Sequence, residues 1–280
     1  MSPGRGRSTL LVLPALVPTV LVLAVALGAT QMQSTGLLPA VGLPDPGLSA
    51  YAVPGGDLGA SVLISLAVAA GATACAALVG LLTALVVVAG GRRGRLVAAL
   101  STLTVPLPHL AAAAATRLLL ADSGLLARLT GTTAGGWPQW VASPGWVAVG
   151  VELAWKESAF IALVVTGTLA VRGPALLETA SLLGAGRRQR LWRVTLPLAT
   201  PALVASSALS FVYAVGSYEV PYLLGRTSPE PLPVLAYRLF TSIDLATRPQ
   251  AAAVAVVTTA LCAASLAVAV VALRRSAAWR

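Results

Sequence analysis

The sequence predicts an all-α polytopic membrane protein with six transmembrane helices. The first observation is composition, because 57% of the 280 residues are hydrophobic and only 10% are charged. With a mean hydropathy of +0.86, the chain is far more apolar than a soluble domain. The second observation is six apolar runs near the length of about 20 residues that a helix needs to cross a bilayer. The third is an uneven distribution of arginine among the loops that join these runs.

The six runs divide the chain into an N-terminal helix, an outer loop and a domain of five spans. The spans are Thr9–Ala29, Ser61–Ala89, Leu96–Leu120, Pro144–Val171, Pro201–Leu224 and Ala251–Leu273. The first run could be interpreted as a signal peptide, but it is longer than the usual apolar core of one and five more spans follow it. We therefore expect a transmembrane helix over residues 1–30, a periplasmic or extracellular loop rich in proline and glycine over 31–57, and the polytopic domain over 58–275. A short amphipathic helix is predicted through "PVLAYRLFTSI" in the last outer loop.

The orientation follows from the arginines in the short loops, since positive loops stay on the cytoplasmic side. With the N-terminus inside, thirteen arginines lie inside: Arg5, Arg7, Arg92, Arg93, Arg95, Arg172, Arg187, Arg188, Arg190, Arg193, Arg274, Arg275 and Arg280. Five lie outside: Arg117, Arg128, Arg226, Arg238 and Arg248. This asymmetry predicts a multi-pass protein of the plasma (inner) membrane with both termini in the cytoplasm. The net charge of +10 is thus a topology signal, and we expect contact with membrane lipid and none with nucleic acid.

The inner loop between spans four and five reads "ETASLLGAGRRQRLWRVTLP" from Glu178 to Pro197. Pro174 suits the first turn of a helix, and apolar residues then recur at intervals of three and four. Gly184 and Gly186 are expected to end that helix, and a second short helix can run through "RRQRLWRV" until Pro197. The pattern favours a helix–turn–helix on the cytoplasmic face that docks a partner.

The spacing of this loop resembles the EAA loop of binding-protein-dependent ABC importer permeases, type-1 transmembrane domain family. That pattern is E-A-A, three residues, G, nine residues, I, one residue, L-P. The matching positions here are Glu178, Thr179, Ala180, Gly184, Val194, Leu196 and Pro197. Every interval agrees, and the two departures, Thr179 for alanine and Val194 for isoleucine, are conservative.

The resemblance implies a permease of type-1 (MetI-like) architecture with residues 173–197 as its coupling loop. Glu178 would make the charged contact to a cytoplasmic ABC ATPase subunit, Gly184 the turn, and Pro197 the angle at which the fifth helix begins. Further implied partners are a second permease subunit, identical or homologous, and an extracytoplasmic solute-binding protein. The chain has no G-x-x-x-x-G-K-[ST] motif and its only lysine is Lys156, so it cannot be its own ATPase. We expect no cofactor, metal site or catalytic residue.

A finer resemblance concerns "AWKESAF" and "FVYAVGSYEVPYLLG". The first is similar to the stretch that precedes the loop in the family. The second is similar to the fifth helix of permeases in the spermidine/putrescine, iron and thiamine branch. This branch implies a small polar solute, and more finely a cationic one.

Charged residues inside spans are costly and usually face a cavity or a partner. Glu152 and Lys156 stand four residues apart in the order that favours a helical ion pair. One interpretation is that this pair attaches the fourth helix to its neighbours. The alternative is that Glu157, Tyr213, Tyr218 and Glu219 line the translocation path. A stripe of hydroxyls on one face of the fifth helix, Ser206, Ser210, Tyr213 and Ser217, is likewise expected to face the axis of a permease dimer, with close helix packing as the alternative.

Two other function classes compete with the importer. A membrane-embedded enzyme needs a nucleophile with a base, or a metal cluster, and His109 is the only histidine; a lone histidine is more often packed and hydrogen-bonded. An ion-gradient-driven secondary transporter should show inverted repeats, and it gives no reason for the spacing of the loop.

Overall fold

The computed structural model describes residues 4–53, 58–132 and 135–275, and these residues form helices and connecting segments without a β-strand. Six helical segments of this part are long and apolar enough to cross a membrane. The predicted fold class, an all-α polytopic membrane protein, is confirmed. Arg280, one of the arginines that favour the orientation, and residues 54–57 of the expected outer loop lie outside the described residues.

The chain divides into two compact units, of which the first comprises Met1–Leu58 and Leu235–Thr259. It contains α1 (Gly4–Ser34), η1 (Ser49–Tyr51), η3 (Leu245–Thr247), most of α10 (Leu232–Phe240) and the first part of α11 (Arg248–Arg275). In α1 the side chains of the apolar window within Val12–Ser34 are not buried, as expected for a helix that faces lipid. The short helix predicted in the last outer loop is confirmed by α10.

The second unit comprises Gly59–Val234 and Ala260–Arg280. Its helical segments are α2 (Leu58–Val88), α3 (Gly91–Thr104), α4 (His109–Leu120), α5 (Leu125–Leu129), α6 (Val147–Leu182), α7 (Arg187–Arg190), η2 (Leu191–Thr195), α8 (Leu196–Gly216) and α9 (Glu219–Leu224), with the remainder of α11. The expected boundary at residue 58 between the N-terminal part and the permease domain stays a prediction.

Small residues bring α2 against α6 in the second unit. The buried positions of α2 recur at intervals of three or four and are Ser61, Ser65, Ala69, Ala72, Ala76, Gly80 and Ala84. A Cβ atom on Gly80 would lie 2.8 Å from Cβ of Ile161 and 2.9 Å from the carbonyl oxygen of Ser158. Membrane helices pack through such small side chains because lipid provides no hydrophobic drive to bring helices together.

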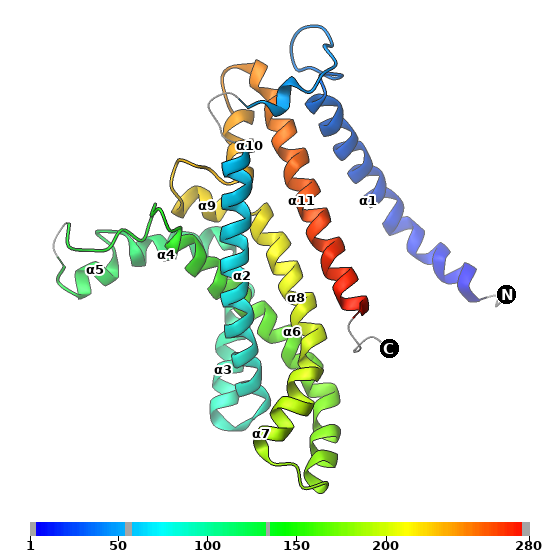
Figure 1. Ribbon diagram of the computed structural model, residues 1–280, viewed down its shortest axis with the longest axis vertical. Coiled ribbons are helices and arrows are strands. Elements are labelled where there is room, and N and C mark those ends of the chain that lie inside the picture. The colour runs from blue at the N-terminus through cyan, green and yellow to red at the C-terminus, as the bar shows by residue number, and fades with distance from the viewer. Residues whose placement is uncertain (1–3, 54–57, 133–134, 276–280) are drawn as a thin grey trace. The chain divides into compact units, whose positions relative to one another are not determined.

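The third expected span, Leu96–Leu120, is not one continuous helix, as a kink predicted at Pro106 and Pro108 already indicates. It is divided into α3 and α4 by a break over residues 105–108, and Figure 1 shows α4 leaving the direction of α3. The break holds Pro106 and Pro108, which lack the backbone N–H that a continuing helix needs.

The fifth expected span, Pro201–Leu224, also consists of two helices. α8 ends at Gly216 and α9 begins at Glu219, so Ser217 and Tyr218 form a second break. In the N-terminal direction, the helical backbone continues from α8 through η2 to Arg187. Pro201 therefore lies inside α8 and does not begin it.

Candidate functional site

The inner loop is built on the C-terminal end of α6. This helix has 36 residues, which corresponds to about 54 Å at 1.5 Å per residue, against about 30 Å for the hydrocarbon core of a bilayer. Its end must therefore project beyond the apolar layer. The expectation that Pro174 begins a new helix is wrong, because Pro174 lies inside α6.

Gly184 forms the turn that ends α6. Its φ is +79°, in the left-handed region where a Cβ atom is disfavoured. The N–H of Gly184 donates to the carbonyl of Ser181 at 3.0 Å, and the N–H of Ala185 donates to the carbonyl of Ala180 at 3.0 Å. These two bonds define a Schellman motif. The glycine predicted at the turn is thus explained by backbone geometry and not by crowding, since a Cβ atom at this position would meet no other atom within 4 Å.

After the turn the chain runs back as a helix that does not end at Pro197. A π-helical turn over Leu191–Thr195 includes a bond from the N–H of Leu196 to the carbonyl of Leu191. A wider turn at this point accommodates Pro197, which has no N–H with which to continue the ordinary ladder. The expectation that the second helix stops at Pro197 is therefore wrong.

Most residues of the loop motif are accessible. Glu178, Thr179, Gly184 and Pro197 are exposed, and Ala180 and Leu196 are half-buried. Beside them Leu182 is 82% exposed, Leu183 is 83% exposed and Trp192 is 63% exposed. Large apolar side chains gathered at the end of a projecting helix mark a surface that a partner can cover.

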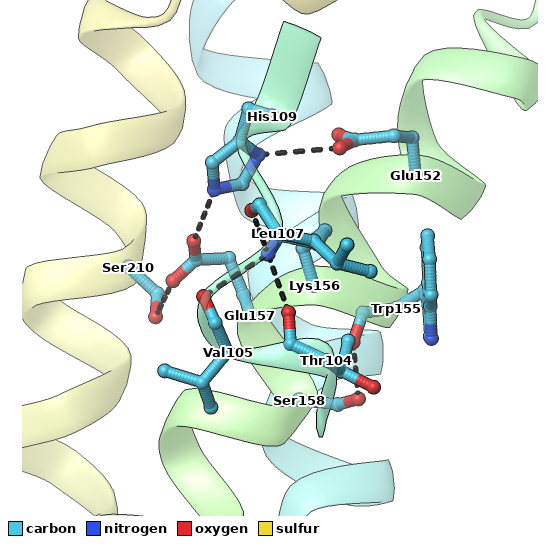
Figure 2. Close-up of polar contacts among 10 residues, drawn as sticks. All are labelled: Thr104, Val105, Leu107, His109, Glu152, Trp155, Lys156, Glu157, Ser158 and Ser210. Carbon is cyan, nitrogen blue, oxygen red and sulfur yellow. Dashed lines mark hydrogen bonds and ion pairs between the residues drawn. The ribbon is translucent and has the colours of Figure 1, made fainter. Parts of the chain in front are cut away.

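A second group of residues, the buried polar cluster, consists of His109, Glu152, Lys156, Glu157 and Ser210 (Figure 2). His109 Nδ1 lies 3.2 Å from Glu152 Oε1, and its Nε2 lies 3.6 Å from Glu157 Oε1. The hydroxyl of Ser210 donates to Glu157 Oε2. Because these residues come from α4, α6 and α8, the cluster joins three helices.

Lys156 completes the cluster by holding the break between α3 and α4. Its ammonium donates to the carbonyl oxygens of Thr104 at 2.8 Å, Val105 at 3.4 Å and Leu107 at 2.6 Å. The last carbonyls of a helix have no partner within it and carry partial negative charge, which favours a cation there.

The structure separates the expected Glu152–Lys156 pair. No ion pair joins these two side chains in the part of the chain that the structure describes; each contacts a different neighbouring segment. The interpretation that both residues attach the fourth helix to its neighbours is supported, although the direct pair is wrong. The expectation of a packed, hydrogen-bonded His109 is confirmed.

Of the residues expected on the translocation path, Glu157 and Tyr213 both contact His109. The rings of Tyr213 and His109 are 4.6 Å apart between centroids, and Tyr213 is 38% exposed. Tyr218 lies in the break after α8, and the exposed Glu219 follows it at the start of α9; Tyr218 stacks on Tyr222 with 5.1 Å between ring centroids. A role of these four residues in a path stays a prediction.

Two serines of the hydroxyl stripe on the fifth helix do not face the axis of a permease dimer as expected. Ser206 and Ser210 are each 1% exposed, and Ser206 donates to the carbonyl of Ala202 at 2.8 Å. The expectation of a dimer-facing stripe is wrong for these two serines, because their side chains are covered within this chain. Close helix packing is the better interpretation.

Comparison with known sequences places relatives among transport permeases. The sulfoquinovosyl glycerol transport system permease protein SmoG of Agrobacterium fabrum is 32% identical over 92 residues, which are 32% of this chain and 30% of that protein. The sulfate transport system permease protein CysT of Escherichia coli is 31% identical over 110 residues, 39% of this chain and 40% of that protein. The molybdenum transport system permease protein ModB of Azotobacter vinelandii is 32% identical over 72 residues, 26% of this chain and 32% of that protein. The matches thus span less than half the length of these relatives.

Two solved structures share the fold across nearly the whole chain. A bacterial ABC transporter involved in the import of the acidic polysaccharide alginate matches with a TM-score of 0.69 and 18% identity, over 97% of both chains. The alginate transporter in complex with alginate pentasaccharide-bound periplasmic protein matches with a TM-score of 0.71 and 18% identity, over 94% of this chain and 93% of that one.

The family described as "Binding-protein-dependent transport system inner membrane component" matches residues 76–278. This range contains the inner loop, the buried polar cluster and five of the six expected spans in whole or in part. The resemblance predicted from the loop is confirmed: the chain belongs to the family of binding-protein-dependent transport system inner membrane components.

Proposed function

We propose that this chain is the permease subunit of an ATP-driven ABC importer, which forms the solute path and docks on a separate cytoplasmic ATPase subunit through residues 173–197. The observation that carries this proposal is the turn at the end of α6, where Glu178 is exposed beside Leu182 at 82% and Leu183 at 83% exposure. Covering a large apolar side chain is worth about 1.5–3 kcal/mol. The loop therefore offers a partner both apolar area and a charge.

Other observations support an ATPase in a separate chain. The sequence has no phosphate-binding glycine loop with its lysine, and the ammonium of Lys156 is occupied by backbone carbonyls. The family is one of transport components, not of enzymes, which also weakens the membrane-embedded enzyme and the ion-driven transporter as alternatives.

The further partners in this proposal are a second permease subunit and an extracytoplasmic solute-binding protein. The family description itself is binding-protein-dependent, and a structural relative is in complex with a solute-bound periplasmic protein. Both termini and the inner loop lie in the cytoplasm in this proposal, as the arginine asymmetry favours.

We propose a sugar derivative or an oxyanion as the solute in place of the cation that the finer resemblance implied. The relatives described above are permeases for sulfoquinovosyl glycerol, sulfate and molybdenum, and none of these names a polyamine, iron or thiamine. The carboxylate of Glu157, an acid suited to attract a cation, is engaged by Ser210 and His109. These observations together give no support to the cationic branch.

Copurification tests the docking role. Tagged protein is expressed in its native host, where its own ATPase partner would be present, and is then solubilised and isolated with Leu182→Asp and Leu183→Asp as variants. The matched control is Leu129→Asp, at a side chain 72% exposed and far from the loop in sequence. We expect the ATPase to be lost from the two loop variants only. Retention in all of them would refute docking through this loop, and no ATPase with the wild type would refute the importer.

Cysteine labelling tests the orientation. In a background with Cys75 and Cys262 replaced, cysteines at Thr227 and Ser228 should react with an impermeant maleimide in intact cells, whereas a cysteine at Ala185 should react only after permeabilisation. The reverse pattern would overturn both the orientation and the cytoplasmic docking.

A further inference from the structure

A cavity of about 300 Å³ lies within the first compact unit, among α1, α10 and α11. Its lining includes Gln33 of α1, Phe240 of α10, and Arg248, Ala251, Ala252 and Ala255 of α11. None of these residues belongs to the inner loop or to the buried polar cluster, so the cavity has no part in the proposed coupling. Its volume is at the lower end of the range for small-molecule sites.

Arg248 gives the cavity a fixed positive charge. Its guanidinium lies 4.0 Å from the centroid of the Phe240 ring, a stacking contact that orients the group. Its Nε is buried and has no hydrogen-bond partner among the described residues. No ion pair neutralises it in that part of the chain either. A buried guanidinium N–H without an acceptor is costly, and the side chain, which is only half-buried as a whole, can offer its other N–H groups to an anion in the cavity.

The cavity lies at the end of two candidate membrane spans. Gln33 is in the last turn of α1, whose candidate span is Val12–Ser34, and Arg248 begins α11, within the candidate span Leu245–Arg274. The ends of spans meet the headgroup layer of a bilayer. Arg248 is moreover at the N-terminal end of a 28-residue helix, where the helix dipole also favours an anion.

From these observations we propose that the cavity binds the phosphate headgroup of an anionic phospholipid. The guanidinium of Arg248 donates to the phosphate oxygens, the amide of Gln33 is the second polar contact, and the alanines of α11 leave room for the start of an acyl chain. This inference goes beyond solute transport and coupling, and it does not depend on them.

The apolar part of the cavity favours a lipid over a soluble anion. Ala251, Ala252 and Ala255 lie at intervals that keep them on one face of α11, and Phe240, which is 54% exposed, borders the same space. A free phosphate ion would gain nothing from these surfaces. A phospholipid can bury its glycerol and upper acyl carbons against them while its phosphate meets Arg248.

Native mass spectrometry of the purified full chain provides the test. The probe is dioleoyl phosphatidylglycerol added to delipidated protein in detergent, compared with dioleoyl phosphatidylcholine. We expect the wild type to retain phosphatidylglycerol preferentially, and Arg248→Gln to weaken this retention by roughly tenfold, as for the loss of one hydrogen bond to a charged group. Arg226→Gln, another arginine of the outer side, should retain the lipid as the wild type does.

A second variant separates the cavity from a general charge effect. Ala255→Leu keeps Arg248 but fills the apolar part, and it should also weaken retention, whereas Ala260→Leu on an exposed position of α11 should not. Size-exclusion profiles must match the wild type for each variant. Equal retention in Arg248→Gln and the wild type would overturn the proposal. So would displacement of the lipid by inorganic phosphate, which would indicate a soluble-anion site.

Discussion

The middle and the end of α6 differ in which side chains they bury and which they expose. In the middle, Glu152, Lys156 and Glu157 are buried and find their partners in α3, α4, α8 and the break after α3. At the end, Glu178 is exposed and two leucines at the turn are more than 80% exposed. In the middle the polar groups find most of their partners within the chain, with Glu152 Oε2 the buried oxygen of this helix that has none among the described residues, whereas at the end the side chains are open to solvent or to a partner. One helix thus combines a structural part with the surface that we propose for docking.

The largest expected effect is on stability, from a substitution in the middle of α6. Lys156→Met removes the cation that three carbonyl oxygens accept from, and each buried carbonyl left without a donor costs about 1–3 kcal/mol. We expect a large fall in the thermal unfolding temperature in detergent, with Lys156→Arg closer to the wild type. A Lys156→Met protein of unchanged stability would show that the break between α3 and α4 does not depend on this side chain.

The next largest effect is a loss of stability when the packing of α2 against the middle of α6 is disturbed. Gly80→Leu forces a side chain against Ile161, and overpacking of this kind costs about 1–3 kcal/mol. Gly71→Leu on the same helix is the matched control, because no atom lies within 4 Å of the corresponding Cβ position. Thermal unfolding should separate the two variants; equal stability would mean that α2 can move away from α6 at little cost.

At the end of α6 the expected change is in function more than in stability. A β-branched residue is disfavoured at the φ of +79° found at Gly184, with a cost of about 1–2 kcal/mol, so Gly184→Val should distort the turn and reduce ATPase association and transport. Gly184→Asn, which tolerates this conformation, should retain both. Gly184→Trp, which also adds bulk at the turn, should block transport while the protein still inserts. Normal transport by Gly184→Val and Gly184→Trp would remove the turn from the coupling role.

The smallest effect is expected at Glu219, which is exposed at the start of α9. For a sugar or an oxyanion, Glu219→Gln should change uptake by less than about twofold, since an exposed charge interacts weakly across water. Uptake of labelled sulfate, molybdate and putrescine in cells with and without the variant measures this. Putrescine uptake that depends on Glu219 would support the hypothesis of a cationic solute and would indicate that this residue lies on the translocation path.

These two regions also differ in how far the sequence can predict them. The inner loop depends on residues within twenty positions of one another, so spacing alone indicates the glycine turn and the exposed acid. The buried polar cluster depends on pairs such as His109 and Glu152, 43 positions apart, or Ser210 and Glu157, 53 apart, and spacing within one helix indicates the wrong partner for Lys156. Apolar length predicts the six spans. Apolar length alone cannot predict the breaks at residues 105–108 and 217–218. Pro106 and Pro108 do indicate a kink at the first of them, whereas the partners that stabilise each break come from other helices and are not visible in the local sequence.

The continuity of α6 has a mechanical consequence. Between Glu157 and Glu178 the helix rises about 32 Å at 1.5 Å per residue, and from Val147 to the single proline at Pro174 its hydrogen-bond ladder is uninterrupted. A tilt of about 10° around the level of Glu157 would move the end of this rod by roughly 5 Å, the length of one helical turn. The helix can therefore act as a lever whose pivot is near the break that Lys156 holds. A displacement of the Gly184 turn would therefore first change the contacts of the break between α3 and α4.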